Sequence, residues 1–374
     1  MPEKKTVKIL HFGNVFLDCP TTDIEAEASA SYREQKRATF RHAVEWAANN
    51  GVHFILITGD LVDNNYATLG TLRFLREVFA SAPDCQFIIT PGAHDYIWND
   101  SIYHLGSFPD NVTVIASETP FHKPYPETDT TVTGWAYFTD CASGAPLRGR
   151  RRPPSDGFSI IAGYADPARG DQPASVTAED IALYGGDYIA LTGPNPFRGF
   201  YKTGADSMFA YSGALENAGY AESGVGGANY VIITQDGEDR VVTAERLQFG
   251  SCRFATEELE VTGVTGEAEI LDRIRTVMEE RGYNGTTALR VIFGGKLPIG
   301  MRLPTSQMAK ELGLYAFTPV DATLPACDES AIARDMTVRG EVCRNLIPRM
   351  RHPDEEERLP AGDALRVTLE VLEG

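Results

Sequence analysis

Acidic and imidazole side chains follow three apolar segments within the first 100 residues. In chain order they are His11, Asp18, Asp60, Asp63, His94 and Asp95. Each apolar segment has the length and composition of a buried strand. The carboxyl ends of adjacent strands in an α/β sheet face one crevice, where such sheets bind their ligands. We therefore expect these groups to line a common site, and nitrogen and oxygen donors that converge in this way can hold a metal ion such as manganese or iron.

The first 250 residues alternate apolar strand-like runs with helical patterns. Six runs are predicted to be buried strands: 7–12, 54–58, 87–90, 112–116, 158–162 and 188–192. Between the first two, Phe40, Ala43, Val44 and Ala47 share one helical face, and Asn49-Asn50-Gly51 ends the helix. Shorter strand-like runs follow at 208–211, 230–234 and 241–247. This order predicts an α/β core in which helices cover a sheet.

A second pattern begins after Ser251. A strand at 259–261, a helix around 270–278, a strand at 289–293, a short helix at 308–312 and a strand at 315–320 predict a small α+β domain. We therefore expect one domain over residues 1–250, a second over 251–350 and a C-terminal tail over 351–374.

Composition restricts the class of protein. The 374 residues are 43% hydrophobic and 23% charged, which is ordinary for a globular protein. No apolar run is long enough to span a membrane, and the N-terminus has no signal-peptide pattern, so we expect a cytoplasmic protein. The six cysteines form no CxxC pair that would indicate a zinc knuckle. With 52 acidic against 34 basic residues, the net charge of −18 argues against DNA binding by this chain alone.

Three motifs at the strand ends, ILHFGNVFLDCP, ITGDLVD and TPGAHDY, carry a family resemblance. They resemble the first three motifs of the calcineurin-like metallophosphoesterases, most of all the bacterial SbcD-like and YhaO-like DNA repair exonucleases. IIAGYADP is similar to the fourth motif, DYIALTGPNP to the fifth and AYSGALENAGYAESG to the segment after it. The stretch from RFATEELEVTG to DMTVRGEV resembles the DNA-capping domain. The resemblance implies a four-layer fold of two β-sheets flanked by helices, with a small α+β capping domain.

Enzymes of this family hold two manganese or similar divalent ions, which activate water and clamp the phosphoryl oxygens. Of the seven ligand positions that the resemblance implies, Asp60 matches. The six changed positions are Asn14, Phe16, Ala93, Ala162, Pro194 and Pro196. Since Phe, Ala and Pro side chains offer no lone pair, we expect no metal in the usual site. We also expect Phe16, Pro194 and Pro196 to fill the former metal cavity.

The distribution of histidines supports this interpretation without an alignment. No histidine lies between residues 123 and 351, so no shift of register restores the imidazoles of the fourth and fifth motifs. His94 and Asp95 remain from the third motif and are interpreted as vestigial catalytic residues.

Each remaining polar group has a structural interpretation beside the functional one. Asp60 could be a residual metal ligand, or a turn carboxylate that accepts backbone N–H groups or pairs with Asn14. His94 could contact phosphate, or form a hydrogen-bonded pair with Asp95 that holds the loop. The basic run Arg148, Arg150, Arg151 and Arg152 could contact DNA or an acidic partner, or be a solvated loop.

Three functions remain open. The first is a catalytically degenerate SbcD/YhaO-like protein, a structural or regulatory scaffold in DNA-end processing. The resemblance implies an SMC-like coiled-coil ATPase of the SbcC or YhaN type as partner, and a possible homodimer. The second is a phosphodiesterase or nuclease that uses a single metal at Asp60. The third is a scaffold unrelated to DNA, which the acidic composition suggests.

Overall fold

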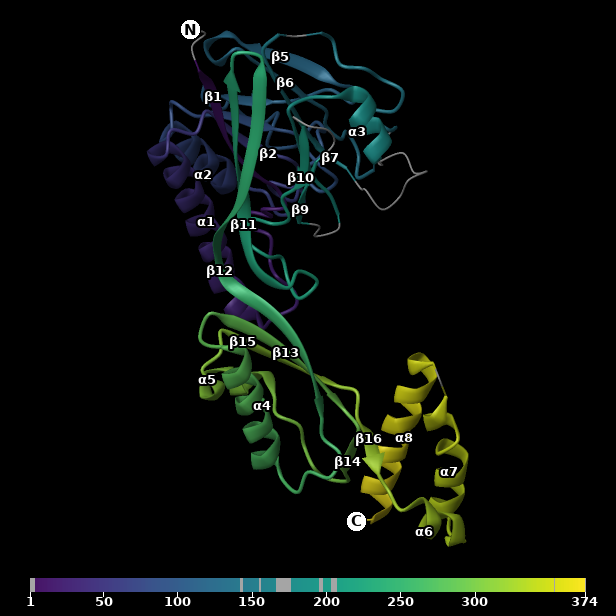
Figure 1. The fold of residues 1–374 in the computed structure, drawn as a ribbon. Coiled ribbons are helices and arrows are strands. Elements are labelled where there is room, and N and C mark those ends of the chain that lie inside the picture. The colour runs from purple at the N-terminus through teal and green to yellow at the C-terminus, as the bar shows by residue number, and fades with distance from the viewer. Residues whose placement is uncertain are drawn as a thin grey trace. The chain divides into compact units, whose positions relative to one another are not determined.

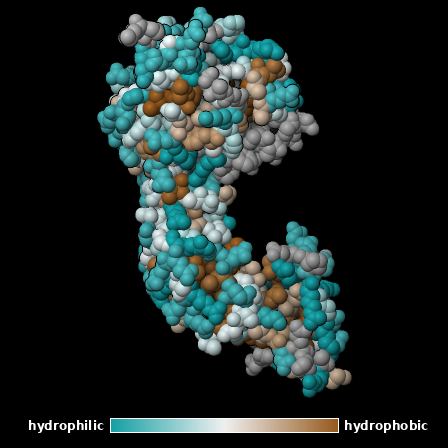
Figure 2. Space-filling model, viewed as in Figure 1, coloured by the Kyte–Doolittle hydropathy of each residue, from teal (hydrophilic) through white to brown (hydrophobic). Residues whose placement is uncertain are grey.

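The computed structural model describes residues 4–141, 144–154, 156–165, 176–194, 198–202, 207–352 and 354–373. Its internal contacts divide the chain into two compact units. Unit 1 comprises Met1–Thr22 and Ser29–Arg253, and unit 2 comprises Asp23–Ala28 and Phe254–Gly374. Among the described residues, no helix is long and apolar enough to cross a membrane. The visible face is largely hydrophilic with scattered apolar patches (Figure 2).

Unit 1 contains two β-sheets. In the first, the strand order is β12-β11-β1-β2-β3-β4. These strands are β1 (Lys5–Phe12), β2 (Phe54–Ile57), β3 (Gln86–Ile89), β4 (Val112–Val114), β11 (Gly224–Asp236) and β12 (Asp239–Glu260). The strands β1 to β4 are mutually parallel, and β11 pairs antiparallel with β1.

The second sheet has the order β5-β6-β7-β8-β10-β9. Its strands are β5 (Phe121–Tyr125), β6 (Thr130–Gly134), β7 (Phe158–Tyr164), β8 (Tyr188–Thr192), β9 (Gly199–Lys202) and β10 (Met208–Tyr211). The central strands β6, β7, β8 and β10 run parallel, and the two edge strands run antiparallel to their neighbours. Parallel order brings the carboxyl ends of β7 and β8 to one edge.

Helices cover the outer faces of both sheets. The helices α1 (Ala26–Asn49) and α2 (Leu69–Ala80) lie over the first sheet, where Phe40 and Phe79 pack against Phe12 and Phe87 (Figure 1). The short helix α3 (Ala178–Tyr184) packs on the second sheet with Trp135 and Tyr164. A third apolar cluster from both sheets fills the space between them. This is the four-layer arrangement that the sequence predicts, and the α/β fold class is confirmed.

Several predicted elements differ from the observed ones. The six predicted strands are present, but β4 is half-buried where a buried strand was predicted, and β5, β6 and β9 were not predicted. The helix α1 begins at Ala26, well before its apolar stripe. The sequence pattern did not indicate this start, because the first two turns carry mostly polar and alanine residues. The run at 241–247 and residues 259–260 belong to one 22-residue strand, β12, which continues through residue 251, and Val261 follows its end. The functional assignment of the domains stays a prediction.

Unit 2 is built on residues 254–260 of β12 together with β13 (Thr287–Gly294) and β15 (Ala316–Asp321). Its helices α4 (Glu267–Arg281) and α5 (Ala309–Leu312) cover one sheet face through Ile270, Ile274 and Leu312. A second apolar cluster in this unit includes side chains from the region predicted as a C-terminal tail. It is formed by α6 (Glu329–Arg334), α7 (Val338–Leu346) and α8 (Glu355–Glu373), which pack beside the two-stranded sheet of β14 (Lys296–Pro298) and β16 (Leu324–Ala326).

Candidate functional site

The crevice lies where the parallel strands of both sheets end. Asn14 follows β1, Asp60 follows β2 and His94 follows β3, while Tyr164 ends β7 and Pro194 follows β8. The sequence analysis placed the first three and Pro194 here. It did not single out Tyr164.

Four non-glycine residues at the crevice have left-handed backbone conformations. The φ angles are +46° at Asn14, +48° at Phe16, +65° at Asp18 and +53° at Asp60. Such angles are uncommon outside glycine and persist only where surrounding structure enforces them. Here the amides of residues 14, 15 and 16 donate to the carbonyls of Gly59 and Asp60 at 2.9–3.1 Å. The loop after β1 is therefore tied to the loop after β2 through main-chain atoms.

Asp60 is bonded to His94 through both carboxylate oxygens. The His94 amide donates to Oδ1 at 2.8 Å, and the imidazole Nδ1 lies 3.0 Å from Oδ2. The Asp60 side chain is buried, whereas that of His94 is about half exposed. The hydrogen bond to Asp60 raises the pKa of His94, which favours the imidazolium that balances the buried carboxylate.

Asp95 has a different partner from the one expected. Its carboxylate accepts hydrogen bonds from the amides of Asp60, Leu61 and Gly92 at 2.6–3.0 Å and from the Tyr103 hydroxyl at 2.6 Å. Burial raises the pKa of Asp95, the charge of Asp60 acts in the same direction, and these donors oppose the rise. The expected His94–Asp95 pair is wrong, because His94 pairs with Asp60 and Asp95 joins the two loops.

Tyr164 occupies the space beside Asp60. A Cβ atom on Gly59 would lie 2.2 Å from the Tyr164 ring, and one on Gly92 would lie 2.7 Å from both the ring and Asp60 Oδ1. The ring packs edge-on against Tyr137 with a centroid distance of 5.4 Å. Burial, and then the charge of Asp60, raise the pKa of the Tyr164 hydroxyl well above its usual range. The two glycines thus leave room for an aromatic ring within the crevice.

The residues at the other changed ligand positions each have their own contacts. Asn14 donates from Nδ2 to the Gly193 carbonyl at 3.0 Å, and it does not pair with Asp60. The Phe16 ring meets the His94 imidazole edge-on at 5.1 Å. Ala93 is half-buried, and Ala162 is buried between the sheets.

The expected filling of the cavity is wrong for Pro194. Pro194 is exposed to solvent, and Pro196 lies outside the described residues. Phe16 is half-buried at the rim, and Tyr164 is the large side chain beside Asp60. Its position two residues after Ala162 in the fourth motif is a signal that could have identified it.

The basic run lies in a loop before β7. Arg148, Arg150 and Arg151 are exposed, and Arg152 is half-buried with its amide donating to the Tyr184 carbonyl at 3.3 Å. The Arg152 Nε is buried without a hydrogen-bond partner. These contacts anchor the loop to the second sheet, and a role in binding stays a prediction.

Sequence comparison decides the family. The family model of the calcineurin-like phosphoesterases matches residues 7–206, more than half of the chain. The chain belongs to this family. It is also 25% identical over 193 residues to the uncharacterized metallophosphoesterase YhaO of Bacillus subtilis (strain 168), a match that covers 49% of this chain and 47% of that protein. The match therefore spans about half the length of this relative.

The comparison with solved structures includes the following two matches. The protein TT1561 of Thermus thermophilus is 12% identical with a TM-score of 0.37, covering 64% of this chain and 99% of that one. A dimetal phosphatase from Danio rerio is 8% identical with a TM-score of 0.36, covering 65% of this chain and 99% of that one.

The metal ions of calcineurin-like phosphoesterases need several converging donors, and this donor set does not fit them. Within the described part of the chain, no group of three or more His, Cys, Asp or Glu side chains is placed to hold a metal. Both oxygens of Asp60 are engaged by His94. The other buried oxygens near it, Asn14 Oδ1 and the Tyr164 hydroxyl, are neutral. Two divalent ions would lack the anionic ligands that offset their charge.

A chain of buried hydrogen bonds lies one residue behind the crevice and joins the two sheets. Its members, in order, are Tyr188, His11, Thr58, Thr192 and Ser212. Successive side-chain atoms are 2.5–2.9 Å apart. Thr58 precedes the Gly59-Asp60 pair, and Thr192 precedes Gly193. This series of hydrogen bonds therefore supports the loops after β2 and β8.

Each hydroxyl in this chain has one proton to donate, which determines the direction of every bond. Ser212 donates to the Gly213 carbonyl at 2.9 Å, so Thr192 must donate to Ser212 and Thr58 to Thr192. The Thr58 oxygen therefore accepts from Nε2–H of His11, and the Tyr188 hydroxyl donates to Nδ1. Burial, and then the charge of Arg246, lower the pKa of His11 to about 3.

We expect His11 to be a neutral imidazole protonated at Nε2 at pH 5. The unfolded chain, with the ordinary pKa of 6.5, then binds one more proton than the folded chain between pH 6.5 and 3. This contribution to stability is complete above pH 6.5 and falls by up to about 1.4 kcal/mol per pH unit on acidification. Long-range ¹⁵N NMR of the ring tests the state directly, and an Nδ1–H tautomer or an imidazolium at pH 5 would contradict it.

Substitution of Asp95 by alanine should be severely destabilising. It leaves three backbone amides and one phenol without their acceptor, and we expect a loss of about 3–5 kcal/mol in urea unfolding. The exposed Asp84→Ala variant is the matched control and should change stability by less than about 0.5 kcal/mol. Equal stability of the two variants would show that Asp95 does not hold the loops together.

Proposed function

We propose that this chain is a catalytically degenerate phosphoesterase that keeps the fold as a binding scaffold. The observation that carries the proposal is the state of the crevice. His94 occupies both oxygens of Asp60, and the Tyr164 ring lies where Gly59 and Gly92 leave space beside it. Hydrolysis by two metals needs open coordination positions and a bound water. This crevice offers neither the ligands nor the room.

The proposed context is DNA-end processing, as a structural or regulatory relative of SbcD-like and YhaO-like proteins. The similarity to the metallophosphoesterase YhaO over 193 residues supports the relation to YhaO-like proteins. With a net charge of −18, the chain would contact DNA weakly or through a partner. We propose a cytoplasmic location and, as partner, an SMC-like coiled-coil ATPase of the SbcC or YhaN type. A homodimer remains part of the proposal.

An exposed stripe on α8 supports a helical partner. Pro360, Ala364, Val367 and Val371 are all exposed, and their spacing of four, three and four residues is that of a coiled-coil seam. Val367 and Val371 are 58% and 70% exposed. A helix of a coiled coil presents the complementary apolar ridge. The stripe is therefore the surface where we place the ATPase.

A single-metal enzyme at Asp60 is the alternative for the crevice. It would require the carboxylate to leave His94 and Tyr164 to move aside. A scaffold unrelated to DNA is the alternative for the context, and the absence of a neighbouring gene for a long coiled-coil ATPase would favour it.

Manganese titration distinguishes the scaffold from the enzyme. We expect no saturable heat on adding Mn²⁺ to the chelator-stripped protein, and no hydrolysis of bis(p-nitrophenyl) phosphate, because the donor set is incomplete. Asp60→Asn and the exposed Asp84→Asn should behave like the unmodified chain. Micromolar binding that Asp60→Asn abolishes and Asp84→Asn retains would overturn the proposal.

Substitutions in the α8 stripe test the partner. We expect Val367→Glu/Val371→Glu to abolish co-purification with a co-expressed coiled-coil ATPase, because two charges would enter an apolar helix seam. The control, Val241→Glu/Val338→Glu, makes the same change at two valines outside α8 that are 55% and 75% exposed, and it should retain the complex. Retention by both variants would remove the stripe from the proposal.

A further inference from the structure

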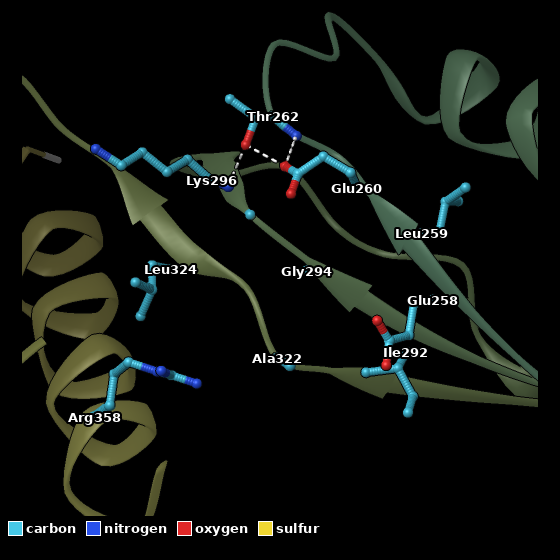
Figure 3. A pocket seen from close by; sticks show the side chains of 11 residues that line it. Glu258, Leu259, Glu260, Thr262, Ile292, Gly294, Lys296, Ala322, Leu324 and Arg358 are labelled. Atoms are coloured by element: carbon cyan, nitrogen blue, oxygen red, sulfur yellow. Dashed lines mark hydrogen bonds between the residues drawn. The ribbon is translucent and has the colours of Figure 1, made fainter. Parts of the chain in front are cut away.

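The part of β12 that lies in unit 1 is at the edge of its sheet. On one side it pairs with β11, and on the other side the strand order continues with β13. Figure 3 shows β13 beside the end of β12 in unit 2, at a groove of about 920 Å³. The Val261 amide donates to the Gly294 carbonyl at 3.0 Å, and β13 has eight residues. Eight residues that end beside Val261 do not extend back to residues 239–250, so β13 leaves this stretch unpaired.

Alternate residues of this stretch turn their backbone amides and carbonyls to the free edge. The two-residue turn Gly237-Glu238 joins β11 to β12, so Asp239 pairs with the last residue of β11 and odd-numbered residues bond to that strand. The Thr243 hydroxyl donates to the Ile232 carbonyl at 3.4 Å, which agrees with this register. The residues whose backbone faces outward are Arg240, Val242, Ala244 and Arg246. Beyond β11, no main-chain hydrogen bond joins residues 239–250 to any residue that the structure describes.

This edge lacks the features that commonly prevent an edge strand from pairing. Such features include proline, lysine, bulges and charged side chains that point inward. Residues 239–248 contain no proline, lysine or glycine. The two inward arginines are already bonded within unit 1, since Arg240 donates to the Asp187 carboxylate at 3.0 Å and Arg246 donates to the Ser212 carbonyl. The backbone of the edge is therefore open to another strand.

We propose that this edge pairs antiparallel with the same edge of a second copy of the chain, with the two-fold axis at Ala244. An interface between identical strands places each residue opposite a fixed partner, and outward-facing residues must meet outward-facing ones. The inference rests on the homodimer that forms part of the proposed function, and it assigns the surface of that homodimer. It does not depend on the state of the crevice.

Charge distinguishes the possible registers. An axis at residue 242 places Asp239 opposite Glu245, and an axis at residue 243 places Arg240 opposite Arg246. An axis at Glu245 or at Arg246 places that residue opposite its own copy. Like charges directly opposite each other destabilise a strand pair. Of the five axes from residue 242 to residue 246, the axis at Ala244 avoids every such pair.

The axis at Ala244 also gives favourable neighbours on the exposed face of the strand. Val241, which is 55% exposed, lies opposite Leu247, and Thr243 lies opposite Glu245. By symmetry each pair occurs twice. Cross-strand pairs of this kind are the unit that stabilises a sheet, and the apolar pair removes Val241 from water.

Sedimentation velocity of the full chain at micromolar concentrations tests the interface. We expect a monomer–dimer equilibrium that Ala244→Pro weakens at least about tenfold, because proline removes an outward amide and leaves the bonds to β11 in place. Val338→Pro is the control. It changes the first residue of α7, which is 75% exposed and where proline fits a helix, and it should dimerise like the unmodified chain.

Cysteine cross-linking tests the register without the proline variant. The background is Cys141→Ser, which removes an exposed thiol. We expect Thr243→Cys mixed with Glu245→Cys to form a disulfide-linked dimer, because opposite Cβ atoms lie about 4.5–5.5 Å apart. Either variant alone should cross-link far less.

The outcomes separate this inference from the homodimer itself. A chain that stays monomeric at all these concentrations would overturn both. A dimer that Ala244→Pro leaves intact, or a mixture of the two cysteine variants that does not cross-link, would overturn the interface at β12 and leave the homodimer standing.

Discussion

The chemistry of the crevice depends on the pairing of Asp60 with His94. A carboxylate buried at the end of β2 has to be hydrogen-bonded and balanced by positive charge, or its burial would be very costly. Here one residue supplies both, with its amide on one oxygen and its imidazole on the other. Divalent ions that would balance this carboxylate in related enzymes are therefore not required for it to stay buried.

The surrounding frame is built from main-chain contacts and buried hydroxyls. Asp95 bonds to amides of two loops, and the Tyr188-to-Ser212 chain supports the loops after β2 and β8. The left-handed residues after β1 are tied to the next loop through backbone atoms. None of these contacts uses the side chain of a residue at a metal-ligand position. Under the proposed function, ligand positions could therefore change to Phe16, Ala93 or Ala162 while the strand ends kept their geometry.

The sequence predicted the fold well, because the signals of strand and helix are local. Apolar runs of four to six residues indicated the central strands, and the spacing of Phe40, Val44 and Ala47 indicated the buried face of α1. The edge strands β5 and β9 were missed because their residues are largely exposed and include Pro124 and Lys202. The apolar periodicity that identifies a strand arises from burial, and edge strands bury few of their residues.

Side-chain partners in the crevice were less predictable. Asp95 adjoins His94 in sequence, yet consecutive residues point in different directions, and His94 reaches Asp60 instead. The sequence did not single out Tyr164, because a tyrosine at the end of a buried strand has no distinguishing signal. Its role follows from Gly59 and Gly92, which lie more than 70 residues away in the chain. Such a contact is a property of the assembled sheets.

The measurement that tests the central claim most directly is a crystal structure of the protein grown with millimolar Mn²⁺, with data collected at the manganese absorption edge. We predict no anomalous density within the crevice, with His94 on Asp60 and the Tyr164 ring between Gly59 and Gly92. Two manganese peaks about 4 Å apart beside Asp60, with Tyr164 displaced, would contradict the claim that this crevice has lost two-metal chemistry.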